Sequence, residues 1–405
     1  MARLLLILPT DTYRTADFMA AARRVGAEVV VASERAQALA AGDDYLQLDF
    51  RDPVGSARAV VELARRRPLD AVIPVDDRGV LVAALAGQAL GLVHNPPEAV
   101  AATRDKAEMR RRLARAGVSQ PDFAVARASD DVAAVAARLG LPCVVKPLSL
   151  SGSRGVIRAD DPQGAAGAAA RIRAILAEAG EDPAGELLVE RYVPGMEVAV
   201  EGLLRDGELE VLAIFDKPDP LEGPYFEETI YVTPSRLPAA TQRRIALLTR
   251  EAAAALGLRE GPLHAEVRLD GGRLWLLEVA ARSIGGLCSR TLRFGLVNRS
   301  LEAILVRHAL RMPLHDLRRE EVSSGVMMLP IPGAGTLQEV RGREEALAVP
   351  GIVDLEMTIP AGRPVRPLPE GDRYLGFLFA RGPTPQAVEA SLREAHRRLE
   401  VLIDP

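Results

Sequence analysis

The sequence predicts a multidomain protein of mixed α/β and α+β class. Its 405 residues exceed what one hydrophobic core usually organises. The first 95 residues alternate short apolar strands with helical segments, which is typical of a βαβ domain with a parallel sheet. Residues 261–286 carry apolar residues at alternate positions on both sides of Gly271-Gly272, which predicts a hairpin of two antiparallel strands.

Composition argues against several classes of function. The chain is 48% hydrophobic and 26% charged with a net charge of −4, and its basic residues are interspersed with acids, so we expect no nucleic-acid partner. No apolar run approaches the roughly 20 residues of a membrane span, and the apolar start reads as a buried strand rather than an export signal. Cys143 and Cys288 are too few for a disulfide framework, so we interpret them as buried thiols in a cytoplasmic, reducing compartment.

The N-terminal domain is expected to span residues 1–95. Its expected strands are residues 3–9, 28–32 and 71–74, and its expected helices are residues 15–25, 54–67 and 79–90. No G-x-G-x-x-G follows the first strand, which argues against a dinucleotide site. Asp76 and Asp77 follow the third strand, where open α/β sheets bind ligands, although a helix-capping role explains either acid equally well.

The next segment contains two lysines and a loop rich in glycine and serine. Residues 96–122 are expected to form a linker with one basic helix at 103–116, which contains Lys106. Strands at 122–125 and 143–146 and a helix at 130–139 follow, and Lys146 ends the second strand. The loop at residues 149–155 offers backbone N–H groups and hydroxyls to phosphate oxygens, although surface hairpins often have the same composition.

The hairpin carries two acids that are expected to face each other. If its turn has an odd number of residues centred on Gly272, Glu266 and Glu278 lie opposite each other, with His264 and Arg282 on the same sheet face. Like charges in opposite positions destabilise a hairpin, so we expect a cation between them, and two carboxylates suit Mg²⁺. A solvated hairpin edge is the alternative that the hairpin alone leaves open.

The C-terminal part lacks chemistry of its own. Residues 325–329 and 374–380 are expected to be strands, and residues 385–402 an amphipathic helix. We therefore expect a small α+β cap at residues 313–405 that covers the substrate side.

Taken in order, these pieces resemble the ATP-grasp enzymes. Asp105-Lys106, Val145-Lys146-Pro147, the glycine-serine loop, VERYVPGMEVAVE, HAEVR and LLEVAAR follow the order and approximate spacing of that family over roughly residues 1–310. The resemblance implies a Rossmann-like N-terminal domain and an ATP site between a lid subdomain, 123–193, and a metal and substrate subdomain, 194–312. The C-terminal remainder is similar to that of the L-amino-acid ligases.

The resemblance also implies which residues contact ATP. The two lysines would meet the phosphates as point charges, the serines and glycines would form a lid, Glu190 and the Val193 backbone would meet the adenine edge, and Glu197 would accept from the ribose hydroxyls. The full set is Lys106, Lys146, Ser151, Gly152, Ser153, Gly155, Glu190, Val193 and Glu197.

The paired acids become metal ligands in this reading. Glu266 and Glu278 would hold Mg²⁺, with Mn²⁺ as an alternative ion, and Arg282 would reach the transferring phosphoryl group or acyl phosphate. The family commonly has Asn two residues after the second acid, whereas this chain has Ala280. Water or Ser283 would then complete the coordination, or a second metal would be held more weakly.

Substrate contacts are expected in and around residues 215–235. Glu228 matches an acid of the amino-acid ligases and would bind an ammonium group or act as base, while Tyr231 stands where histidine is often found and implies a changed substrate. Arg290 would hold a carboxylate bidentately, and His264 would meet a phosphate or carboxyl group unless it is simply a hydrogen-bonded strand histidine. The expected catalytic residues are Arg282, Glu228 and His264.

The sequence thus predicts an ADP-forming carboxylate–amine ligase that makes an amide or peptide bond through an acyl phosphate. Its partners would be small-molecule carboxylate and amine substrates, one of them an amino acid. Two alternatives stay open: an ATP-dependent carboxylase of the purine or biotin type, and a nucleotide-binding regulatory protein with little turnover, suggested by Ala280. We expect no membrane partner, and the oligomeric state is open, with a homodimer as the working guess.

Overall fold

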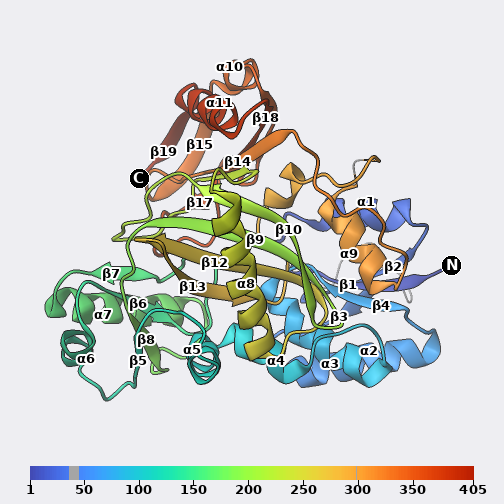
Figure 1. Ribbon diagram of the computed structural model, residues 1–405, viewed down its shortest axis with the longest axis horizontal. Helices are drawn as coiled ribbons and strands as arrows, with labels where there is room; N and C mark the ends of the chain where they lie inside the picture. The colour runs from blue at the N-terminus through green and yellow to red at the C-terminus, as the bar shows by residue number, and fades with distance from the viewer. Residues whose placement is uncertain (36–44, 298) are drawn as a thin grey trace.

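A parallel sheet in the order β3-β2-β1-β4 forms the N-terminal domain (Figure 1). The computed structural model describes residues 1–35, 45–297 and 299–405. The strands are β1 (Arg3–Ile7), β2 (Glu28–Ser33), β3 (Tyr45–Gln47) and β4 (Ala71–Pro74), and the helices are α1 (Thr15–Arg24), α2 (Pro53–Arg66) and α3 (Val80–Leu90). Every residue of β1 is buried, as expected for a central strand of a parallel sheet.

The linker forms two helices where the sequence predicted one. These are α4 (Pro97–Arg104) and α5 (Lys106–Arg115), and they are separated by Asp105, whose backbone is extended. The Asp105 side chain caps α5 by accepting from the N–H groups of Ala107 and Glu108. Because of this break, Lys106 is the first residue of a helix.

The lid subdomain has its own antiparallel sheet in the order β5-β8-β6-β7. Its strands are β5 (Phe123–Ala126), β6 (Cys143–Pro147), β7 (Ile157–Ala159) and β8 (Leu187–Arg191). Helices α6 (Val132–Leu139) and α7 (Pro162–Glu178) pack against it and bury one hydrophobic cluster that includes Cys143. The loop at 149–155 joins β6 to β7, as predicted.

The chain leaves the lid sheet for a larger sheet through residues 192–195. Gly195 has a φ of +100°, and a Cβ there would lie 2.2 Å from the carbonyl oxygen of Leu269, so no other residue fits this turn. The turn brings Glu190, near the end of β8, and Glu197, near the start of the next strand, to neighbouring places between the two sheets.

The large sheet continues into the C-terminal part of the chain. Its order is β13-β12-β9-β10-β11-β14-β18-β16. The first five of these are β13 (Arg273–Ala280), β12 (Gly261–Asp270), β9 (Met196–Arg205), β10 (Glu208–Lys217) and β11 (Ile230–Thr233), and the last three are β14 (Ser323–Leu329), β18 (Gly376–Gly382) and β16 (Ile352–Met357). The expected cap at residues 313–405 shares this sheet, because β14 pairs with the edge of β11 and continues the ladder past residue 313. The boundary at 313 stays a prediction.

The remaining elements cover this sheet. Helix α8 (Ala239–Leu256) packs on β13 and β10. A small sheet in the order β17-β15-β19 lies beside the C-terminal strands. The other elements are β15 (Gly335–Arg341), α10 (Arg343–Leu347), β17 (Pro364–Val365), α11 (Pro385–Arg397) and β19 (Glu400–Asp404).

The hairpin register is produced differently from what the sequence suggested. Its turn has two residues, Gly271 and Gly272, flanked by the pair Asp270 and Arg273, so the expected odd number is wrong. A bulge between Glu266 and Val267 in the register adds one residue on β13. The acids at 266 and 278 therefore still face each other.

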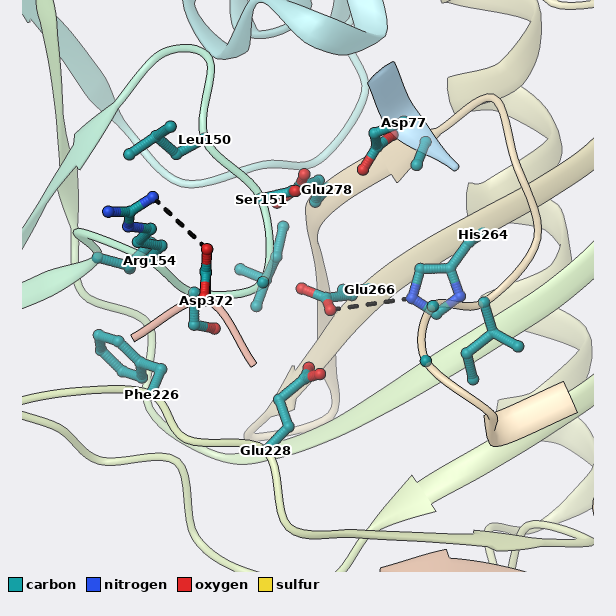
Figure 2. A pocket seen from close by; sticks show the side chains of 18 of the residues that line it. Asp77, Leu150, Ser151, Arg154, Phe226, Glu228, His264, Glu266, Glu278 and Asp372 are labelled. Carbon is teal, nitrogen blue, oxygen red and sulfur yellow. Dashed lines mark ion pairs between the residues drawn. The ribbon is translucent and has the colours of Figure 1, made fainter. Parts of the chain in front are cut away.

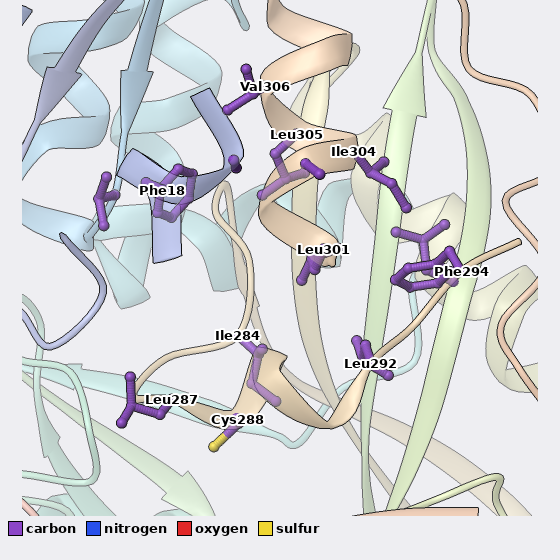
Figure 3. Close-up of a cluster of buried hydrophobic side chains, with 14 of the residues drawn as sticks. Phe18, Ile284, Leu287, Cys288, Leu292, Phe294, Leu301, Ile304, Leu305 and Val306 are labelled. Carbon is purple, nitrogen blue, oxygen red and sulfur yellow. The ribbon is translucent and has the colours of Figure 1, made fainter. Parts of the chain in front are cut away.

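A hydrophobic cluster joins the N-terminal domain to the large sheet (Figure 3). Phe18 of α1 packs with residues of α9 (Leu301–Ala309) such as Leu305, and the cluster continues through Ile284 and Cys288. Both cysteines are buried and free, which confirms that they form no disulfide.

Candidate active site

A cavity of about 570 Å³ lies where the N-terminal domain, the lid subdomain and the large sheet meet (Figure 2). Apart from Gly155, the residues expected to contact ATP all line it. Both expected metal acids, Glu228, Tyr231, His264 and Arg282 also line it. The structure thus brings residues from three parts of the chain to one place.

The two predicted phosphate lysines are held by different partners. Lys106 Nζ donates to the carbonyl oxygen of Leu150 at 2.6 Å and lies 3.8 Å from a carboxylate oxygen of Glu278. Lys146 Nζ lies 2.6 Å from Glu190, which Arg110 also contacts at 2.5 Å. Burial alone would raise the pKa of Glu190, but these two cations lower it to about 2. Glu190 therefore fixes Lys146, a role that the sequence reasoning did not anticipate.

A small apolar cluster lines the cavity beside the crossing between the sheets. Tyr192 and Phe226 stack with ring centroids 6.3 Å apart, and Val144 and Leu221 pack with them. The guanidinium of Arg268 lies over both rings, 5.3 Å from the centroid of Tyr192 and 5.7 Å from that of Phe226.

Arg268 also occupies groups that were expected to meet the nucleotide. It donates to the carbonyl oxygens of Val193 at 2.5 Å and Leu221 at 2.6 Å, and to Glu197 at 2.8 Å. Sequence reasoning missed this residue, since its partners are far away along the chain.

Lys217 is a second residue that the sequence reasoning missed. It is 4% exposed, and its ammonium nitrogen lies 2.6 Å from Glu197 and 3.1 Å from Glu266, and also contacts Glu228. Oxygens of these three acids lie within 4.8 Å of one another. Burial lowers the pKa of Lys217, but the three carboxylates raise it well above its ordinary value. The expected cation among the acids is thus partly supplied by the protein itself.

A sequence signal for Lys217 did exist. The chain contains three lysines, and the other two are Lys106 and Lys146, which line the cavity. In a chain that otherwise uses arginine as its cation, a lysine marks a position where a compact point charge is needed.

The opposed acids fit a hard divalent ion. The side chains of Glu266 and Glu278 are 24% and 31% exposed and offer carboxylate oxygens, the ligands that Mg²⁺ prefers. Ala280 lies opposite His264 and has no ligand atom. Ser283 does not fill this gap, because it is buried and its hydroxyl accepts from Arg14 at 2.9 Å.

His264 is held by a buried acid behind it. Its Nδ1 lies 2.6 Å from Glu201, and its Nε2 lies 3.9 Å from Glu266 (Figure 2). Burial lowers the pKa of His264, but the hydrogen bonds to these carboxylates raise it to about 9. The imidazole is therefore cationic at neutral pH. Among the described residues, Glu201 Oε2 has no partner.

Arg282 is positioned by the N-terminal domain. Its Nε lies 2.9 Å from Asp77, and this ion pair raises the pKa of Arg282 against the effect of burial and lowers that of Asp77. Asp76 instead caps the short 3₁₀ helix η2 (Asp77–Gly79). The capping interpretation is thus confirmed for Asp76, and both acids line the cavity, while their contact with a ligand stays a prediction.

The lid loop contacts the C-terminal part of the chain. Ser151, Gly152 and Ser153 line the cavity. The N–H of Gly155 donates to the carbonyl oxygen of Pro369 at 3.0 Å, and Arg154 lies 4.0 Å from Asp372 (Figure 2). The lid loop therefore contacts the segment that precedes β18, whereas the expected metal acids lie on the hairpin of β12 and β13.

Arg290 is not brought to the cavity. It lies on the 3₁₀ helix η3 (Cys288–Thr291) and pairs with Asp17 at 3.0 Å and Glu356 at 3.1 Å. These ion pairs link α1 to β16, so the Arg290 side chain does not line the cavity that holds Glu228, Glu266 and Glu278.

Family models match three segments of the chain. Residues 139–291 match an ATP-grasp domain, residues 19–94 an ATP-grasp N-terminal domain, and residues 327–404 the L-amino acid ligase C-terminal domain 2. Together the three segments span well over half of the chain.

Curated relatives match over part of their length. Alanine–anticapsin ligase of Bacillus subtilis is 30% identical over 243 residues, which is 56% of this chain and 51% of that protein. D-alanine–D-alanine ligase of Cupriavidus metallidurans is 31% identical over 217 residues, 51% of this chain and 58% of that protein. The chain thus spans about half the length of these curated relatives.

Solved structures share the fold along the whole chain. The L-amino acid ligase from Bacillus licheniformis matches with a TM-score of 0.82 and 24% identity, covering 100% of this chain and 99% of that one. Carboxyaminoimidazole ribonucleotide synthase from Aspergillus clavatus, complexed with ATP, matches with a TM-score of 0.75 and 19% identity, covering 98% of this chain and 99% of that one. These matches show the fold. The two ATP-grasp family models, which together match more than half of the chain, show that it belongs to the ATP-grasp superfamily, with a C-terminal segment like that of the L-amino acid ligases.

Proposed function

We propose that the protein is an ATP-dependent, ADP-forming ligase that joins a carboxylate to an amine, with an amino acid as a substrate. The observation that carries this proposal is the single cavity that collects two lysines, two opposed acids and Arg282. The names of the alanine–anticapsin and D-alanine–D-alanine ligases support an amino acid as substrate. Among the described residues, no helix is long and apolar enough to cross a membrane.

The first half of the reaction is phosphoryl transfer. Lys106 and Lys146, fixed by Leu150 and Glu190, would hold the phosphates of ATP at the mouth of the lid. Glu266 and Glu278 would hold Mg²⁺, which supplies charge stabilisation when bound. Arg282 stays protonated beside Asp77 and would stabilise the charge on the transferring group.

The substrates supply the nucleophiles. Burial raises the pKa of the Cys288 thiol, so it stays protonated, and His264 Nδ1 is engaged by Glu201. A substrate carboxylate oxygen would attack the γ-phosphorus and release ADP, giving an acyl phosphate. A neutral amine would then attack the carbonyl carbon, and the C–O bond to phosphate would break.

Glu228 would receive the proton of the amine. It lies at the cavity beside Glu266 and Lys217, and burial raises its pKa against the effect of Lys217. A carboxylate with a raised pKa is a better general base near neutral pH. An ammonium substrate would equally be bound here before it loses its proton.

The test is phosphate release from MgATP with pairs of amino acids, followed by identification of the amide product. We expect release that depends on both a carboxylate and an amine. Glu278→Gln should abolish most of it, whereas Glu208→Gln, an exposed acid on β10, should not. If bicarbonate alone drives turnover, the carboxylase alternative holds, and if no pair does, the regulatory alternative holds.

A further inference from the structure

One end of the cavity has an apolar wall. Tyr231, Ile284, Cys288 and Met328 line the cavity and belong at the same time to the hydrophobic cluster that joins the domains. Figure 3 labels Ile284 and Cys288 of this wall. Each of them is at most 4% exposed. Because a packed core resists rearrangement, this wall has a fixed shape.

The charges nearest the wall, on Arg14, Lys217 and Glu228, are already engaged in ion pairs. Sγ of Cys288 lies 3.5 Å from Sδ of Met328, and burial keeps the thiol protonated. The nearby guanidinium of Arg14 is 3% exposed and lies 3.4 Å from Glu302, while also donating to Ser283. A charged group that entered here would lose its water and would have to compete with these existing ion pairs for a partner.

The rim of this end is aromatic and has room for a side chain. The Lys217 ammonium lies 5.1 Å from the ring centroid of Tyr231, and Tyr374 also lines the cavity. Gly286 has a φ of +57° and packs on Phe377, since a Cβ at this position would lie 2.8 Å from that ring. Gly286 therefore lines the cavity without a side chain of its own, while Ile284 of the same loop forms part of the wall.

Glu228 connects the apolar wall with the acids that are expected to face the phosphates. It lines the cavity and contacts Lys217, whose ammonium lies 5.1 Å from the ring centroid of Tyr231. A carboxylate oxygen of Glu228 lies within 4.8 Å of a carboxylate oxygen of Glu266. An α-ammonium group bound at Glu228 can therefore face the reacting end while its side chain faces the wall.

We infer that the amino acid bound beside Glu228 carries an apolar side chain, aliphatic, thioether or aromatic, which lies against Tyr231, Ile284, Cys288 and Met328. This inference rests on the proposed function and names its substrate class. It excludes aspartate, glutamate, lysine and arginine as good substrates at this position.

The experiment measures kcat/KM by phosphate release for alanine, leucine, methionine and phenylalanine against aspartate, glutamate and lysine, each paired with the same second substrate. We expect the wild type to favour the apolar set by about 10²-fold or more, because a charged group would lose its water and would have to compete with existing ion pairs. Met328→Ala should enlarge the pocket and shift the ratio for phenylalanine over alanine by about tenfold.

Met327→Ala is the matched control. Met327 precedes Met328 on β14, is 4% exposed and packs in a different hydrophobic cluster, on the opposite face of the sheet. Met327→Ala removes the same side-chain atoms as Met328→Ala, but from a core that does not line the cavity. It should therefore lower the thermal unfolding temperature and leave the ratio of kcat/KM for phenylalanine over alanine unchanged.

The outcomes separate this inference from the proposed function. If the wild type uses charged amino acids as well as apolar ones, or if both methionine variants shift the ratio equally, the inference is overturned while amino-acid-dependent phosphate release still supports a ligase. If no amino acid releases phosphate, the proposed function itself fails, and the inference with it.

Discussion

Replacing Lys217 by methionine would remove the one cation that three buried or half-buried carboxylates share. The ammonium lies 2.6 Å from Glu197 and 3.1 Å from Glu266 and contacts Glu228. Removing one partner of a buried ion pair destabilises a protein by about 3–5 kcal/mol, because it leaves an uncompensated charge. Protonation of Glu228, whose pKa burial already raises, relieves part of the repulsion. We therefore expect Lys217→Met to lower the free energy of unfolding by about 3–5 kcal/mol at pH 7.

Urea unfolding of the whole chain measures this loss. Lys146→Met is the control, because Lys146 has one carboxylate partner, Glu190, which keeps its 2.5 Å contact with Arg110. Its loss should be clearly smaller. Adding Glu228→Gln to Lys217→Met should recover stability, with a coupling of about 0.5–3 kcal/mol in the double-mutant cycle. If Lys217→Met unfolds at the same urea midpoint as the wild type, or if the coupling free energy between positions 217 and 228 is zero, the three acids do not share Lys217 as their cation.

Three further predictions address the acids and the lid. Glu278→Gln should leave the metal-free protein as stable as the wild type or slightly more stable, because it relieves the repulsion with Glu266. It should also lower turnover by a factor of about 10² or more. Unchanged turnover together with unchanged stabilisation by MgATP would contradict the metal assignment. The pKa of Glu190 falls from 4.5 to about 2 on folding, so the ionised carboxylate stabilises the protein fully above pH 4.5 and loses this effect as the pH falls through 2. The difference in urea midpoint between wild type and Glu190→Gln should therefore shrink over that range. A constant difference counts against the ion pairs. Amide exchange in residues 149–155 should slow when ATP and Mg²⁺ are added, and equal protection would show that this loop is not a lid.

The sequence by itself determined the local structure and the order of the chemical groups. Alternating apolar residues, helix caps and glycine turns are properties of neighbouring residues, so most strands and helices of residues 1–35, 45–297 and 299–405 lie where they were expected. The order of motifs from Lys106 to Arg282 identified the ATP-grasp superfamily, because a series of spaced motifs is far more specific than any one of them.

The tertiary structure decided which charges meet. A bulge in β13, invisible in the alternation of residues, gives Glu266 and Glu278 their register, and the pairing of β11 with β14 makes the expected cap part of the large sheet. Lys217 meets Glu266 from 49 positions away, and Arg290 meets Asp17 from 273 positions away, which removes it from the cavity. Ion pairs of this kind depend on how the sheets are arranged around the crossing at 192–195, and no local pattern records that arrangement.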